Sequence, residues 1–253
     1  MAAGYRIAAA TGLDPGDRDY QQDQLCLLNH PSHTGCLLGV VADGMGGRSG
    51  GRKASDQVIL TARQLFERFD PTDPPALFLE QLVREAHLVI KLIAIASEEE
   101  PHSTVAAFLL LPSGECHWIH CGDSRLYHYR NERLLQRSVD HSYVQRLVEL
   151  GELDAGAARF DPRSNILLSC LGAEQEPQTC HRQLDTVLPG DTLLACSDGL
   201  WHHFSDAELG EILHQLTPRE ACEFLVQRTR SRAQGRSDNI SLIVVSLEPA
   251  SSP

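Results

Sequence analysis

The stretch LLGVVADGMGG, residues 37–47, is an apolar run that stops at an aspartate followed by glycine. The run predicts a buried strand, and Asp43-Gly44 predicts a sharp turn at its end because glycine has no Cβ. Three other aspartates adjoin apolar runs: Asp123 after 118–122, Asp198 after 193–197, and Asp238 before 240–245. Strand ends that meet would gather these carboxylates into one cluster, which hard divalent cations such as Mg²⁺ or Mn²⁺ stabilise.

Length and composition favour one large globular domain spanning residues 1–253, with 42% hydrophobic and 22% charged residues. The formal net charge of -12 argues against nucleic-acid binding. The eight cysteines include no Cys-x-x-Cys pair, and neither a signal peptide nor a membrane-spanning apolar run is evident. We therefore expect free thiols, no membrane association and a cytoplasmic location. A weaker alternative is that Cys121 binds zinc together with His117 and His120.

Hydrophobic periodicity places strands in blocks and helices in pairs, which favours an α+β fold with antiparallel sheets over alternating βαβ units. The expected strands are 5–11, 24–29, 36–42, 104–111, 115–121, 125–129, 191–196 and 239–247. The expected helices are 54–69, 76–96, 143–150, 205–213 and 218–231. The polar stretch 151–164 has few large apolar residues and is expected to form part of a surface flap over about 141–170.

Motifs that run nearly end to end through the chain resemble one known family. They are RDYQQD (18–23), VADGMGGRSGGRKAS (41–55), Ser103-Thr104, GDSRLY (122–127), DHS (140–142), DPRSNILLSCLG (161–172), CSDGL (196–200) and SDNISLIVV (237–245). Each is weak alone, but together and in this order they are specific. The chain resembles the metal-dependent serine/threonine protein phosphatases, the PPM (type 2C) family, in its short bacterial type.

The resemblance implies two antiparallel β-sheets packed as a central sandwich, flanked by pairs of α-helices, with a dinuclear metal site at one end. It also implies two Mn²⁺ or Mg²⁺ ions and a third, weakly bound one. Asp43 would bridge both main ions and the Gly44 carbonyl would bind one of them. Asp198 and Asp238 would bind the other ion, and Asp123 would join Asp198 at the third position.

Two further residues take roles around the metals in this resemblance. Asp23 would orient a metal-bound water, and Arg18 would grip the substrate phosphate. The residues fit that chemistry, since paired metals lower the pKa of a shared water and a guanidinium can hold two phosphate oxygens. The implied function is hydrolysis of phosphoserine and phosphothreonine in proteins by attack of a metal-bridging hydroxide.

Other functions and partners remain open at this point. The same fold could be a catalytically inactive phosphoprotein-binding module, or a metal phosphoesterase that acts on small molecules. The resemblance implies phosphorylated protein substrates, an opposing serine/threonine kinase and a monomer, with no nucleic-acid or membrane partner.

The chain departs from the family pattern at several positions near the expected site. Gln22 stands where a glutamate is common, and Arg48, where many relatives have His, is a further candidate for substrate binding. Asp161 replaces a flap histidine, so no proton donor is available at that position. His202 or His203, which follow Trp201, are alternatives for that proton, as is metal-bound water.

Overall fold

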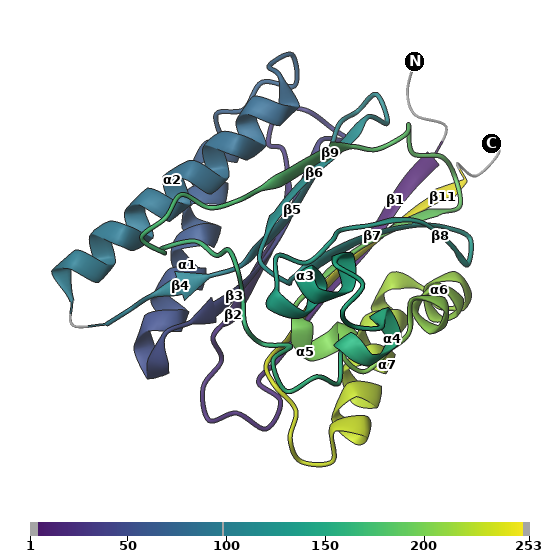
Figure 1. Cartoon of the computed structure of the whole chain (residues 1–253). Helices are drawn as coiled ribbons and strands as arrows, with labels where there is room; N and C mark the ends of the chain where they lie inside the picture. Colours follow the sequence, from purple (N-terminus) through teal and green to yellow (C-terminus); the bar gives the residue numbers. More distant parts are fainter. Residues whose placement is uncertain (1–4, 98, 250–253) are drawn as a thin grey trace.

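The fold is an α+β sandwich in which two antiparallel sheets face each other (Figure 1). The computed structural model describes residues 5–97 and 99–249, without the side chain of residue 48. In strand order, the first sheet consists of β1 (Tyr5–Asp14), β11 (Ile240–Pro249), β10 (Asp191–Cys196), β7 (Arg125–Arg130) and β8 (Arg133–Arg137). The second consists of β2 (Asp23–Asn29), β3 (Leu37–Met45), β5 (Val105–Leu110), β6 (Cys116–Cys121) and β9 (Cys180–Gln183), with β4 (His102–Ser103) paired to the end of β3.

Each sheet has one apolar face in the centre of the sandwich and a second covered by helices. Helices α1 (Gly47–Phe66) and α2 (Pro75–Ala96) pack on the second sheet through one buried cluster. Helices α6 (Asp206–Gln215) and α7 (Pro218–Ala233) pack on the first sheet through another. A third cluster, which includes Phe108 and Trp118, joins the two sheets. The predicted sandwich with flanking helix pairs is confirmed.

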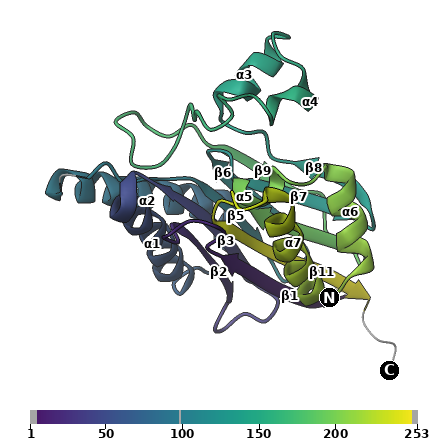
Figure 2. The same cartoon turned by 90° about the horizontal axis from the view of Figure 1, so that it is seen from below.

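The flap stands away from the sandwich, as Figure 2 shows. It contains α3 (Tyr143–Glu149) and α4 (Ala155–Ala158), so the segment expected to be irregular includes a short helix. Asp154 explains that helix, because its side chain accepts hydrogen bonds from the first backbone N–H groups. A single antiparallel bridge between Ser142 and Leu167 joins the two ends of the flap.

Helix α1 begins at Gly47, well before the expected start at residue 54. Glycines are needed at Gly44 and Gly51 because the helix approaches the end of β3 closely. A Cβ on Gly44 would lie 2.0 Å from the carbonyl oxygen of Gly51. The Gln22 side chain also donates to the Gly47 carbonyl at 2.6 Å. Tertiary contact therefore overrides the low helix propensity of glycine.

No helix in the described part of the chain is both long enough and apolar enough to cross a membrane.

Candidate metal centre

The predicted aspartates lie at one end of the sandwich, where strands of both sheets begin or end. Asp23 and Asp43 face each other as register partners on β2 and β3. Asp123 lies in the link from β6 to β7, which passes from the second sheet to the first. Asp198 follows β10 and Asp238 precedes β11, its neighbour in the first sheet. The fold thus brings together side chains from five separate segments.

The backbone around Asp43 is held by hydrogen bonds from the following segment of the same sheet. The Asp43 amide donates to Thr104 Oγ1 at 3.0 Å, and its carbonyl accepts from the Thr104 amide at 2.8 Å. Ser103 Oγ donates to the same carbonyl at 3.1 Å. At the next residue, the Gly44 amide donates to the Gln22 carbonyl at 3.2 Å. These contacts fix the end of β3, so the Asp43 carboxylate projects from a rigid support.

Asp23, Asp43, Asp123 and Asp198 have raised pKa values because they are buried near other carboxylates of the cluster. Burial, followed by the charges of neighbouring aspartates, raises the pKa of Asp43 and Asp123 well above 3.8. Burial also raises the pKa of Asp198, although nearby His202 acts in the opposite direction. Like charges in a buried position are costly unless a cation compensates them.

Asp23 has one oxygen that is bound and one that is free. Its side chain is 1% exposed, and burial raises its pKa to about 7 although the hydroxyl groups of Ser197 and Ser241 lower it. Asp23 Oδ2 accepts from Ser197 Oγ at 2.6 Å, whereas Oδ1 is buried without a hydrogen-bond partner in the described residues. A buried oxygen without a donor fits a position beside a bound water or ion.

The donor set fits hard divalent cations, because it consists of carboxylates and a backbone carbonyl. Among residues 5–97 and 99–249, no three His, Cys, Asp or Glu side chains already lie at the spacing that holds an ion. The carboxylates nevertheless share one end of the fold, and their oxygen donors are of the type that a hard divalent cation prefers.

Arg18 lies at the rim of this cluster. One of its amino groups donates to Asp238 Oδ2 at 2.7 Å, and its side chain is 62% exposed. The hydrogen bond to Asp238, with further attraction from Asp198 and Asp43, raises the pKa of the arginine. The expected proximity of Arg18 to the cluster is thus observed. The side chain of Arg48 lies outside the described residues, so its substrate role stays a prediction.

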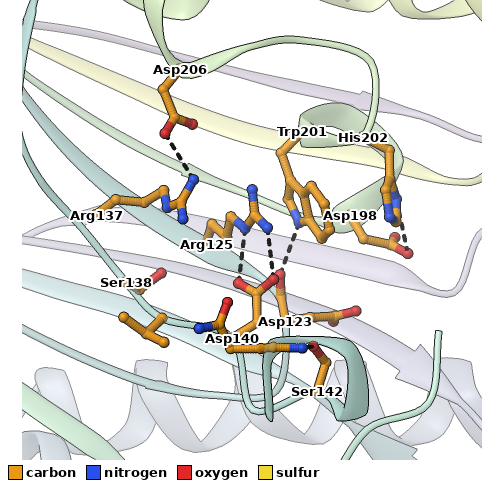
Figure 3. A network of polar contacts seen from close by, with 12 residues as sticks. Asp123, Arg125, Arg137, Ser138, Asp140, Ser142, Asp198, Trp201, His202 and Asp206 are labelled. Carbon is orange, nitrogen blue, oxygen red and sulfur yellow. Dashed lines mark hydrogen bonds and ion pairs between the residues drawn. The ribbon is translucent and has the colours of Figure 1, made fainter. Parts of the chain in front are cut away.

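His202 contacts the cluster, which distinguishes it from its neighbour His203 in the sequence. Its Nδ1 lies 3.7 Å from Asp198 Oδ2, and its ring centre lies 3.9 Å from that of Trp201 (Figure 3). Burial lowers the pKa of His202 although Asp198 acts in the opposite direction. The motif alone could not choose between the two histidines; the short helix α5 (Asp198–Trp201) makes the choice by turning His202 towards Asp198.

A network behind the cluster was missed by sequence reasoning. Arg125 donates to both oxygens of Asp140, at 2.8 and 2.7 Å, and lies 3.4 Å above the ring of Trp201. Trp201 Nε1 in turn donates to the Asp123 carbonyl at 2.9 Å (Figure 3). The network therefore ties the backbone of Asp123 to the start of the flap. Arg125 lies two residues after Asp123, but its pairing with Asp140 appears only in three dimensions.

The alternative zinc site does not form. Successive residues of a strand point to opposite faces, so His117 and Cys121 lie on one face of β6 and His120 on the other. His117 instead contacts Glu115 at 2.7 Å and His181 at 3.1 Å.

Comparison with known proteins identifies the family. A sequence model described as Protein phosphatase 2C matches residues 17–234. The serine/threonine phosphatase stp of Listeria innocua is 32% identical over 218 residues, which cover 81% of this chain and 82% of that protein. The serine/threonine protein phosphatase PstP of Mycobacterium tuberculosis is 30% identical over 217 residues, which cover 84% of this chain and 40% of that protein.

Solved structures agree with this result. The catalytic domain of PstP in complex with two manganese ions superposes with a TM-score of 0.79 at 28% identity, covering 96% of this chain and 98% of that one. PppA of Pseudomonas aeruginosa superposes with a TM-score of 0.79 at 30% identity, covering 97% and 99%. The chain belongs to the protein phosphatase 2C family.

Proposed function

We propose that this chain is a metal-dependent phosphatase that hydrolyses phosphoserine and phosphothreonine in protein substrates. The observation that carries the proposal is the convergence of Asp23, Asp43, Asp198 and Asp238 at one end of the sandwich. Relatives named serine/threonine phosphatases, and a relative's structure with two manganese ions, support it.

The proposed centre holds two Mn²⁺ or Mg²⁺ ions. Asp43, the Gly44 carbonyl, Asp198 and Asp238 would hold these ions. Asp123 serves the weaker third position. When bound, such ions lower the pKa of water and offset the negative charge of the phosphoryl group.

The remaining steps fall to side chains at the edge of the centre. Asp23 accepts a hydrogen bond from the attacking water through its free Oδ1, while Ser197 holds its other oxygen in place. Arg18 binds the substrate phosphate with its planar fork. Its present contact with Asp238 is an exposed ion pair, worth at most about 1 kcal/mol, so a phosphate dianion can displace it.

We also infer the wider setting of this activity. Residues 1–253 act as one catalytic domain with its flap at 141–170, as a monomer, and oppose a serine/threonine kinase in the cytoplasm. Eight cysteines without a disulfide support a reducing compartment. The net charge of -12 supports the absence of a nucleic-acid partner.

The test is phosphate release from a phosphothreonine peptide by protein treated with EDTA and then given Mn²⁺. We expect turnover only after Mn²⁺ is added. Tight peptide binding without turnover would support the inactive binding module. Faster hydrolysis of p-nitrophenyl phosphate and nucleotides than of any phosphopeptide would support the small-molecule phosphoesterase. Turnover that persists in EDTA would contradict the proposed metal dependence.

A further inference from the structure

A cavity of about 290 Å³ lies under the flap, beside the Arg125–Trp201 network. Its walls come from α3 and α4 of the flap on one side, and from β7, β8 and the segment around 201–206 on the other. This volume is at the lower end of the range for small-ligand pockets, and it suits one or two side chains. We call it the flap cavity, defined by Arg125, Arg137, Asp140, Arg159, Trp201 and Asp206.

The two carboxylates of the flap cavity are already neutralised. Asp140 is 7% exposed, and both of its oxygens accept hydrogen bonds from Arg125. Asp206 Oδ2 accepts from Arg137 Nη1 at 2.8 Å (Figure 3). The Arg125–Asp140 pair is bidentate and buried, so it holds its geometry, whereas the Arg137–Asp206 pair is a single, partly exposed contact whose charges offset each other.

Arg159 is a third guanidinium in this cavity, and it has no carboxylate partner among the described residues. Its Nη1 donates to the Phe204 carbonyl at 3.3 Å, and its guanidinium carbon lies 4.6 Å from the ring centre of Phe160. Three arginines against two aspartates give the lining a net positive charge of one. The chain as a whole carries -12, so the flap cavity differs in sign from the net charge of the protein. A guanidinium fork with free N–H groups selects carboxylate and phosphate oxygens.

Trp201 separates the flap cavity from the metal centre. It lines the cavity, its Nε1 donates to the Asp123 carbonyl, and it ends the same short helix that begins at Asp198. One side chain thus lies between the cavity and the cluster. Because Trp201 belongs both to the cavity wall and to the helix that begins at Asp198, the cavity adjoins the place where the phosphorylated residue would bind.

We propose that the flap cavity binds an anionic side chain that neighbours the phosphorylated residue of the substrate. Either the carboxylate of Asp or Glu or a second phosphate supplies the anionic oxygens. The proposal rests on the phosphatase function proposed above and adds a substrate class to it: acidic or multiply phosphorylated segments. Arg159 is the specificity-determining residue, because its charge is not committed to a carboxylate of the chain.

The test is a panel of phosphothreonine peptides of equal length, assayed with the Mn²⁺-loaded protein. Each peptide carries alanine, glutamate or a non-hydrolysable phosphonate analogue of phosphoserine at one neighbouring position. We expect kcat/KM for the best acidic peptide to exceed that of the all-alanine peptide by about tenfold or more, as for a charge-assisted hydrogen bond. A larger gain with the phosphonate than with glutamate identifies a second phosphate as the ligand, and equal gains identify any anionic side chain.

Variants separate the cavity from a general effect of charge. We expect Arg159→Ala to reduce the ratio of acidic to neutral kcat/KM to about one, and Arg159→Lys to retain part of the preference because it keeps the charge. The matched control is Arg146→Ala, which removes an arginine of α3 that pairs with Glu149 at 3.3 Å and does not line the cavity. It should keep the wild-type ratio.

Two results would overturn the proposal: equal rates for acidic and neutral peptides at every position, or an equal loss of preference in Arg159→Ala and Arg146→Ala. If no peptide is turned over, the phosphatase function fails instead. Calorimetric titration then tests the cavity separately, by comparing the affinity of phosphonate peptides with and without a neighbouring glutamate. Equal affinity for both peptides would exclude an anion site, and tighter binding of the acidic one that Arg159→Ala abolishes would support it.

Discussion

The two ends of strand β10 carry aspartates in opposite surroundings. At its start, Asp191 is fully buried and accepts hydrogen bonds from Arg130 at 2.6 and 3.0 Å and from His128 at 2.9 Å. Burial by itself would raise the pKa of Asp191, but these hydrogen bonds lower it to about 2. Just past the other end, burial raises the pKa of Asp198, and the charge of Asp238 adds to that effect.

The difference separates a structural carboxylate from a functional one. The chain supplies one cation, Arg130, and further hydrogen-bond donors for Asp191, so that the charge of Asp191 contributes to stability. It places Asp198 among other carboxylates, where the charge costs stability unless an ion arrives from solution. A buried aspartate paired with a positively charged side chain therefore indicates a structural role. A buried aspartate surrounded by other carboxylates indicates a functional site.

The largest effect is expected at the metal end, for Asp198→Asn. The amide keeps the volume of the side chain but removes the negative charge that a divalent ion requires. We expect kcat/KM for a phosphothreonine peptide to fall by about a thousandfold, or about 4 kcal/mol of transition-state stabilisation. Mn²⁺-dependent phosphate release measures it. Activity close to that of the wild type would remove Asp198 from the proposed centre.

Thermal unfolding provides the control for this variant. Mn²⁺ at a hundred times its dissociation constant should stabilise the wild type by about 2.7 kcal/mol, because it binds only the folded chain. Asp198→Asn should show a much smaller gain, and Asp191→Asn the same gain as the wild type. Equal stabilisation of all three proteins would show that the ion binds elsewhere.

At the structural end of β10 we expect the reverse pattern. Asp191→Asn leaves the partly buried Arg130 and the buried His128 without a negative partner, which should cost about 3 kcal/mol of the free energy of unfolding. Urea denaturation at neutral pH measures this loss, and kcat/KM per folded molecule should stay unchanged. Asp185→Asn, an exposed aspartate nearby in the sequence, is the control and should change stability by less than about 0.5 kcal/mol. A similar value for Asp191→Asn would mean that its pairing contributes nothing.

Strand β10 also shows what the sequence predicts well. Its bounds, Asp191–Cys196, agree with the run predicted from hydrophobicity, because both faces of the strand are covered by the core. The short strands β8 and β9 were not predicted. Each lies at the edge of its sheet, and polar sequences such as CHRQ carry no apolar pattern that would reveal them.

The candidate site divides in the same way. Asp43, Asp123, Asp198 and Asp238 could be selected one by one, since each adjoins one end of an apolar run. Their partners could not be selected, because the contacts join residues far apart in sequence. Arg18 and Asp238 are separated by 220 positions, and Arg125 meets Asp140 only because β7 and β8 bring the start of the flap back to the centre. Pairing of this kind is a property of the folded chain.

The smallest expected effect is a dependence on pH that distinguishes the two ends of β10. The folded pKa of Asp191, about 2, lies below its unfolded value of about 3.9, so its contribution is present above about pH 4 and is lost as the pH falls towards 2. The stability difference between the wild type and Asp191→Asn should therefore be constant from about pH 5 to 7. At pH 3 it should be smaller by about 1 kcal/mol, roughly half of the ionic contribution.

Urea denaturation in EDTA at pH 6 and pH 3 measures that difference. The wild type must be compared with Asp191→Asn, because Asp198 changes the stability of the wild type in the opposite direction as the pH falls. Its folded pKa is raised, so protonation at low pH relieves a repulsion and stabilises the metal-free fold, which partly masks the loss at Asp191 in the wild type alone. Both proteins contain Asp198, so its contribution cancels in the difference. A difference that stays the same at pH 3 would show that Asp191 is not held ionised by Arg130 and His128, and the contrast between the two ends of the strand would lose its electrostatic basis.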